Sequence, residues 1–140
     1  SIFRLLGFHC RFNVVMRKLT VLICIFLIFS GLLLAYPEWL SLGDHGKIAE
    51  LVHIWLGLIF MVVFPIYSWD HIRSHRQRLN IISRISISGG IQLMTGTGLI
   101  VTGIILLLYS ADALPLPAEV HELLTYVLVG TLILHSRVTR

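Results

Sequence analysis

Four long runs without a charged residue constrain this sequence more than any other feature. An α-helix needs about 20 mainly apolar residues to cross the hydrocarbon core of a bilayer. The first three runs are long enough by themselves, and the fourth becomes so when its helix extends past both ends; the runs are 19–37, 51–69, 85–111 and 123–136. We therefore predict an all-α integral membrane protein, a four-helix bundle with helices over about 12–37, 51–71, 85–110 and 119–137.

The composition agrees with a membrane protein. Of the 140 residues, 56% are hydrophobic and 13% are charged, whereas soluble domains have about 45–50% apolar and about 25% charged residues. A chain this small cannot bury so many apolar side chains in one core, so membrane lipid is their expected partner. The length predicts one domain, residues 1–140. The formal net charge of +4 follows from the placement of charges around a membrane, and we predict no nucleic-acid partner.

The charges divide between the two sides of the predicted membrane. Lys47 is the one Lys or Arg between the first and second charge-free runs or between the third and fourth, where six acidic residues lie: Glu38, Asp44, Glu50, Asp112, Glu119 and Glu122. The other ten of the eleven Lys and Arg residues lie before the first run, between the second and third, or after the fourth: Arg4, Arg11, Arg17, Lys18, Arg73, Arg76, Arg78, Arg84, Arg137 and Arg140. Cytoplasmic loops carry the excess of Lys and Arg, so both termini are predicted to be cytoplasmic.

Two histidines of the fourth predicted helix need an explanation, because ionisable groups within a span are costly and mark functional sites. His121 and His135 lie fourteen residues apart. At about 100° and 1.5 Å per residue, they project within about 40° of one another and about 21 Å apart along the axis. One face of this helix therefore presents an imidazole near each leaflet, an arrangement that suits two stacked metal centres.

The second predicted helix repeats this arrangement. His53 opens it at the outer side, level with His121, and His71 follows after eighteen residues, or five turns. We predict an outer pair, His53 with His121, and an inner pair, His71 with His135. The rise from His53 to His71 is about 27 Å, against about 21 Å on the fourth helix. Pro65 is also expected to kink the second helix, so the depths of the inner pair match less closely.

Two facing histidines at each level favour haem over zinc. They are too few for a closed tetrahedral zinc site, whereas a porphyrin supplies four equatorial nitrogens and needs only axial ligands from the protein. Gly57, one turn after His53, would let a macrocycle lie against the backbone, and Arg73 and Arg84 would meet propionates at the inner side. The alternative interpretation is that the histidines are solvated interfacial residues.

Small residues run along the third predicted helix. Glycines at 96, 98 and 103 alternate there with threonines at 95, 97 and 102. Small side chains let a neighbouring helix approach closely, which is the ordinary reason for such a pattern. They would also make room for a flat cofactor.

The chain resembles the dihaem cytochrome b membrane subunits of respiratory formate dehydrogenases, thiosulfate reductases and nickel–iron hydrogenases. The resemblance rests on the four spans and on His121 and His135. It also rests on residues 11–31, which are similar to the family's first helix, and on VHIWLG at 52–57, which is similar to the start of its second. It implies that the fourth helix ligates both haems, that His53 ligates the outer one, and that electrons pass between a membrane quinone and a partner subunit.

The sequence departs from that family at the second ligand of the inner haem. The family's first helix supplies a histidine there, where this chain has Arg17 or Thr20, depending on which end of the helix is aligned. Either His71 substitutes from the second helix, or His9 or His75 reaches the site, or the inner haem is absent. A related group of small membrane cytochromes carries a His-x-x-x-His pair after the second helix, similar to His71 and His75, which favours His71.

These observations predict a multi-pass subunit of a bacterial cytoplasmic membrane. It would carry electrons through two haems b between the quinone pool and an iron–sulfur or multihaem cytochrome partner. The chain has no nucleophile–base pair, phosphate-binding loop or open metal site, so we expect an electron-transfer subunit of a larger oxidoreductase rather than an independent enzyme. The alternative function is a membrane anchor, haem-free or with a single haem, that docks a peripheral redox protein. A third is a small transporter with a histidine proton relay, although neither an internal repeat nor a broken helix was found in the sequence.

Overall fold

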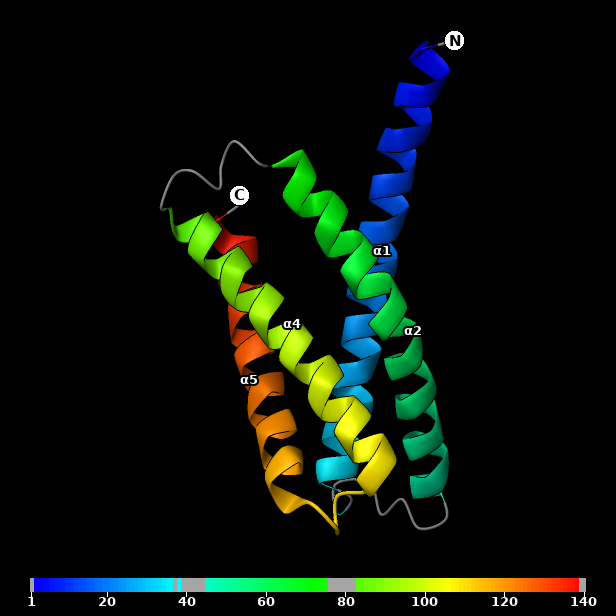
Figure 1. Cartoon of the computed structure of the whole chain (residues 1–140), viewed down its shortest axis with the longest axis vertical. Helices are drawn as coiled ribbons and strands as arrows, with labels where there is room; N and C mark the ends of the chain where they lie inside the picture. The colour runs from blue at the N-terminus through cyan, green and yellow to red at the C-terminus, as the bar shows by residue number, and fades with distance from the viewer. Residues whose placement is uncertain (1, 37, 39–44, 76–82, 139–140) are drawn as a thin grey trace. The chain divides into compact units, whose positions relative to one another are not determined.

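Four long α-helices and their short connections make up the computed structural model (Figure 1). It describes the backbone of residues 2–36, 38, 45–75 and 83–138, and the side chains of 14–36, 38, 46–75 and 83–137. The helices are α1 (Ile2–Ala35), α2 (His45–Ser74), α4 (Arg84–Tyr109) and α5 (Pro115–Val138). Each contains a segment long and apolar enough to cross a membrane. The all-α prediction with four membrane-spanning helices is confirmed, while the side on which the termini lie stays a prediction.

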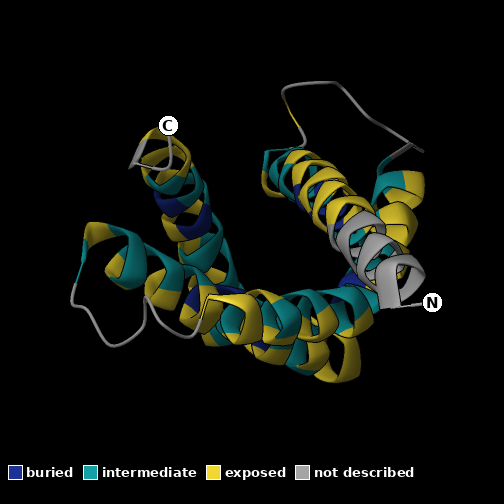
Figure 2. Ribbon diagram, turned by 90° about the horizontal axis from the view of Figure 1, so that it is seen from above, coloured by how far each residue is buried: buried dark blue, intermediate teal, exposed yellow. Residues whose placement is uncertain are grey.

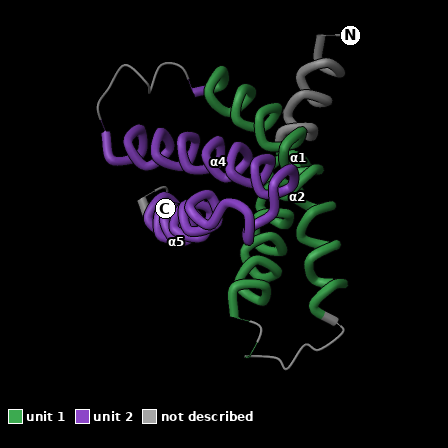
Figure 3. The backbone as a smooth tube through the Cα atoms, turned by 60° about the horizontal axis from the view of Figure 1, so that its bottom comes forward, with its two compact units in different colours: residues 1–74 green, residues 75–140 purple. Residues whose placement is uncertain are grey.

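The chain divides into two compact units, residues 1–74 and 75–140 (Figure 3). The first unit consists of α1 packed against α2, and the second of α4 packed against α5. Each unit is a helical hairpin whose two helices run in opposite directions. Each hairpin has its own internal packing, and the single domain stays a prediction.

The helix ends explain where the connections fall. Ser83 caps α4: its backbone is extended, with φ −125° and ψ 159°, and its Oγ accepts a hydrogen bond from the Ser86 N–H at 3.2 Å. At the other end, Ser110 adopts a left-handed φ of 63°, and its N–H donates to the Leu106 carbonyl at 2.9 Å. These two features begin and end α4 close to the predicted bounds.

The fourth helix begins earlier than its predicted start near residue 119, and it includes Pro115 and Pro117. Helix α5 begins at Pro115, so both prolines belong to its first turn. The first four N–H groups of a helix have no partner within the helix, so a proline there removes nothing that the helix needs. Helix α5 consequently reaches spanning length by extending towards its N-terminus.

The other boundaries also lie outside the predicted ones. Helix α1 begins at Ile2 rather than near residue 12, and α2 begins at His45 rather than near residue 51. Helix α2 continues through Pro65 as one element. The predicted end of the first helix at Pro37 falls outside the described residues.

A narrow stripe of buried residues holds each hairpin together (Figure 2). In the second unit it contains Thr95, Gly96 and Thr102 of α4 and Leu128 and Thr131 of α5. The hydroxyls of Thr102 and Thr131 bond back to carbonyls of their own helices, as Thr131 does to Val127 at 2.9 Å, so the helices approach closely while these hydroxyls stay hydrogen-bonded. This confirms close helix packing as a role of the small residues of α4.

The first hairpin is held together in the same way. Thr20, Ile23, Cys24 and Ser30 of α1 and Phe60 of α2 are buried. Phe60 also stacks on Phe64, with ring centroids 4.9 Å apart. Most large apolar side chains outside these stripes are exposed, which is the arrangement of helices whose outer surfaces contact lipid.

We predict that Leu128→Ala destabilises the protein by about 2 kcal/mol. Leu128 is 5% exposed, and its removal leaves a cavity between α4 and α5. The free energy of unfolding, measured by titration from mild to denaturing detergent, tests this. Leu134, on the same helix and 58% exposed, is the matched control, and its alanine variant should change stability by less than about 0.5 kcal/mol. Equal losses for the two variants would contradict the described packing.

Candidate functional site

Three histidines point into the interior of their hairpins and meet a hydroxyl group of the neighbouring helix. Nδ1 of His53 on α2 lies 2.9 Å from the Ser30 Oγ on α1. In the second unit, Nδ1 of His121 lies 2.7 Å from the Thr102 Oγ1, and Nδ1 of His135 lies 2.9 Å from the Ser88 Oγ. These are three of the four histidines predicted as haem ligands.

A glycine follows each of these hydroxyl residues and leaves room for the ring. A Cβ atom built on Gly31 would lie 3.2 Å from the His53 Cε1, and one built on Gly103 would lie 3.5 Å from the His121 Cε1. The corresponding distance from Gly89 to the His135 Cε1 is 4.0 Å. We call each hydroxyl–glycine pair a histidine slot; the three slots are Ser30–Gly31, Ser88–Gly89 and Thr102–Gly103.

The hydroxyls of the slots also contact carbonyls of their own helices. The Ser30 hydroxyl lies 2.7 Å from the Phe26 carbonyl, and the Thr102 hydroxyl lies 2.9 Å from the Gly98 carbonyl. A carbonyl only accepts, and a hydroxyl has a single hydrogen to donate, so a hydroxyl that donates to its carbonyl accepts from the imidazole. This network favours the tautomer with the hydrogen on Nδ1. In the neutral ring the lone pair then lies on Nε2, the nitrogen that can bind a metal.

The two slots of the second unit lie at two levels of one antiparallel pair. His121 and His135 are fourteen residues apart on α5, and their partners Thr102 and Ser88 are fourteen residues apart on α4 in the opposite order. Fourteen residues rise about 21 Å. Between them, one turn from the Ser88 slot, the Gln92 side chain of α4 donates to the Thr131 backbone carbonyl of α5 at 3.1 Å, which is consistent with the same register. The predicted presentation of two imidazoles on one face of the fourth helix, one near each end, is thereby supported.

The second helix of the first unit has the same seven-residue spacing as α5, but one of its two end positions is not a histidine. On α5, buried Leu128 lies seven residues after His121, and His135 lies seven residues after that. On α2, buried Phe60 lies seven residues after His53, and Tyr67 lies seven residues after that. Tyr67 consequently occupies the position in its hairpin that His135 occupies in the other.

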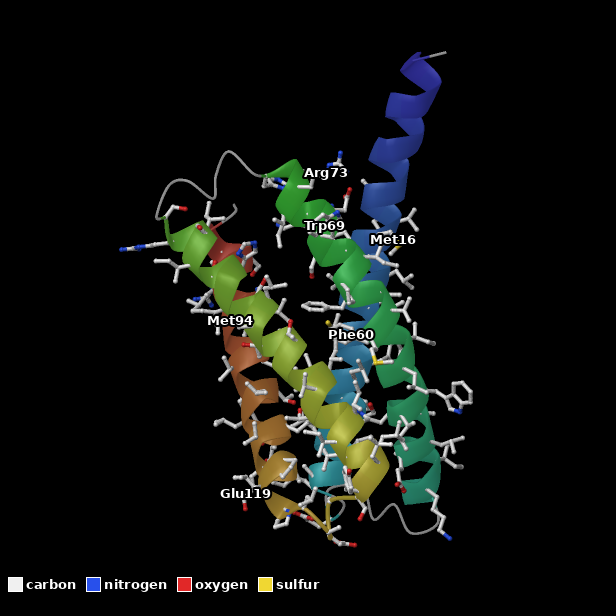
Figure 4. The ribbon with its side chains drawn as sticks, viewed as in Figure 1. Met16, Phe60, Trp69, Arg73, Met94 and Glu119 are labelled. Carbon is white, nitrogen blue, oxygen red and sulfur yellow. The ribbon has the colours of Figure 1, made fainter. Side chains whose placement is uncertain are left out.

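At the level of Tyr67, the residues of α1 also differ from those of α4 at the level of His135. Fourteen residues before Ser30–Gly31 stand Met16 and Arg17, where α4 has Ser88–Gly89. Met16 lies level with the part of α2 that carries Trp69 (Figure 4). Within the described residues the first unit thus holds one histidine slot and the second unit holds two.

The slots and the repeated hairpin were missed in the sequence. A signal was present: residues 49–53 read AELVH and residues 118–121 read AEVH, each at the start of a hairpin's second helix. The Ser-Gly and Thr-Gly pairs stand at matching places on the first helices. These short matches have no significance until the packing shows which residues face one another.

The remaining predicted ligand, His71, has different surroundings. It is exposed in the last turn of α2, four residues after Tyr67, and its ring stacks on the Tyr67 ring at a centroid distance of 5.6 Å and an angle of 25°. The two proposed ligand pairs, His53 with His121 and His71 with His135, each join residues of different units, so both pairs stay predictions. His75 is exposed in the turn after α2, and the side chains of His9 and His45 fall outside the described residues.

The predicted haem contacts lie at accessible positions. A Cβ built on Gly57 would meet nothing within 4 Å, so the backbone there is open to a flat group. Arg73 is exposed in the last turn of α2, and Arg84 is exposed at the first residue of α4 (Figure 4 labels Arg73).

No group of three or more His, Cys, Asp or Glu side chains gathers into a metal-binding cluster among the described residues. A site built from protein ligands alone would need such a group.

Comparison of the chain with protein-family models, with curated proteins and with solved structures found no match. The resemblance to dihaem cytochromes b therefore rests on the residues and the topology given above, and it stays a prediction.

We predict that Gly31→Ala destabilises the first hairpin. The new Cβ would lie 3.2 Å from the His53 Cε1, and the ring is held in place by its bond to Ser30, so the overpacking should cost about 1–3 kcal/mol. Gly130 has open space around it, and Gly130→Ala should stabilise its helix by up to about 1 kcal/mol. Unfolding titrations of both variants in mild detergent test the difference. A stabilising Gly31→Ala would mean that the His53 ring does not lie in the slot.

Proposed function

We propose that the protein is a membrane b-type cytochrome that carries electrons across the bilayer through haems with two axial histidines each. The observation that carries the proposal is the repeated histidine slot: three imidazoles on two hairpins make the same hydroxyl contact through Nδ1. Solvated interfacial histidines have no reason to share one part-buried environment and one kind of hydroxyl contact. Histidines that ligate a metal commonly have their second nitrogen hydrogen-bonded in this way.

The outer haem would be held by His53 and His121. His53 lies eight residues after the first residue of α2, and His121 lies six residues after the first residue of α5. If both helices enter the membrane from the same side, as the distribution of Lys and Arg indicates, the two rings lie at similar depth, about two turns into the span. The open backbone at Gly57, one turn after His53, would accept the macrocycle.

The inner haem would be held by His135 and by His71. His135 occupies a slot on α4, and His71 lies one turn beyond the position of Tyr67 that matches His135 in the repeat. Arg73 and Arg84 are exposed and would pair with the propionates.

When bound, each haem would supply a one-electron iron couple. Held by one imidazole from each of two helices, such a haem would exchange electrons rather than bind oxygen. The protein's contribution is to hold the rings, to keep their hydrogens on Nδ1 and to surround the groups with apolar side chains, which limit access of water. Such a chain transfers electrons and performs no bond chemistry of its own.

The same reasoning suggests the electron partners. A multi-pass chain with a redox centre near each leaflet connects a carrier dissolved in the membrane with a protein at its surface. We therefore propose a quinone or quinol as one partner and an iron–sulfur or multihaem cytochrome subunit as the other, with the chain in a bacterial cytoplasmic membrane and both termini in the cytoplasm.

We expect the protein, purified in mild detergent, to show the reduced-minus-oxidised spectrum of low-spin haem b. His53→Ala and His121→Ala should each remove the same haem, because both rings ligate it, while His45→Ala should retain it. A pyridine haemochrome assay counts the haem per chain. Wild-type protein without haem would contradict the proposed function and favour a haem-free membrane anchor.

The inner haem is tested by four further variants. We expect His135→Ala and His71→Ala to leave one haem per chain, while His9→Ala and His75→Ala keep two. Loss of a haem in His9→Ala or His75→Ala but not in His71→Ala would show that the inner ligand is assigned to the wrong residue. A single haem in the wild type, lost with His121, would show that the inner haem is absent.

A further inference from the structure

The three slots combine two contacts that do not depend on one another. A serine or threonine inside a helix is already satisfied by bonding back to its own helix, as Thr97 does to the Leu93 carbonyl at 2.8 Å. Thr102 makes this same bond and in addition meets His121 at 2.7 Å. Its imidazole contact is therefore more than a way to satisfy a hydroxyl within the membrane.

The glycine restrains the ring at a second point. The hydroxyl holds Nδ1, and the bare backbone of the next residue faces Cε1, the neighbouring ring atom. Two contacts along one edge limit both the tilt of the imidazole and its rotation about the Cβ–Cγ bond. The fit is closest at Gly31 (3.2 Å), intermediate at Gly103 (3.5 Å) and loosest at Gly89 (4.0 Å), so the outer rings are the more tightly restrained.

We infer that Ser30, Ser88 and Thr102 are positioning residues that hold their histidines in the Nδ1–H tautomer and so present Nε2 to iron. This inference rests on the proposed function for its metal, while the tautomer itself is a property of the chain without haem. Donation from Nδ1–H to an oxygen raises the basicity of the ligand. A more basic ligand stabilises the ferric state and lowers the midpoint potential of the haem.

The test is Thr102→Val, which replaces the hydroxyl by a methyl group of similar size. We expect the haem-free protein, labelled with ¹⁵N-histidine and placed in bilayers, to show the Nδ1–H tautomer at His121 in the wild type and a mixture of tautomers in the variant. In a haem titration, the variant should bind the outer haem about ten- to a hundredfold more weakly than the wild type does. The midpoint potential of that haem should rise, and the potential of the inner haem should not change.

Two controls separate the imidazole contact from a general packing effect. Thr97 is exposed and bonds only within its own helix among the contacts described, so Thr97→Val should leave both readouts unchanged. Thr102→Ser keeps the hydroxyl and should restore the tautomer and the potential. A wild-type His121 with its hydrogen on Nε2, or a Thr102→Val variant with unchanged tautomer and potential, would overturn the inference. Wild-type protein that shows the Nδ1–H tautomer but binds no haem would support the slot and contradict the proposed function.

Discussion

An imidazole placed within a membrane span must have its polar atoms hydrogen-bonded, and the rest of this structure follows from how that is done. Water is scarce at this depth, so an unsatisfied nitrogen costs several kcal/mol, as other buried polar groups do. The partners here are hydroxyls of the adjacent helix, at 2.7–2.9 Å. Such short side chains reach an imidazole only if the helices are close, which explains why glycine follows each hydroxyl residue. The histidines thus determine both the register of each hairpin and the small residues on its first helix.

The two hairpins differ in how many imidazoles they hold in this way. The second has an imidazole at both levels, whereas the first has an imidazole at one level and Tyr67 with Met16 and Arg17 at the other. A phenol and a guanidinium replace an imidazole and a glycine there, so the replacement involves both helices. The difference between the hairpins at this level is therefore not confined to Arg17. It involves α1 and α2 together, with His71 stacked on Tyr67 one turn further along.

Several features could be predicted from the sequence because they depend on composition and on helix geometry alone. Long apolar runs require helices in lipid, and a spacing of fourteen residues places His121 and His135 on one face of any regular helix. The helix boundaries were predicted less well. Residues such as Pro115 and His45 are compatible with a loop or with a first helical turn, and local propensity does not separate the two. The pairing of His53 with His121 and of His71 with His135 stays a prediction, because each pair joins different hairpins.

The sequence by itself determined that this chain is an all-α membrane protein with histidines at two depths, since hydrophobicity and helical period act along a single chain. Only the tertiary structure decided which histidines are held and by what. Ser30 lies twenty-three residues from His53, and Ser88 lies forty-seven residues from His135. No local rule relates such positions, because their contact depends on the register in which two helices pack. That register brings ordinary Ser-Gly and Thr-Gly pairs against the imidazole rings and so forms the slots.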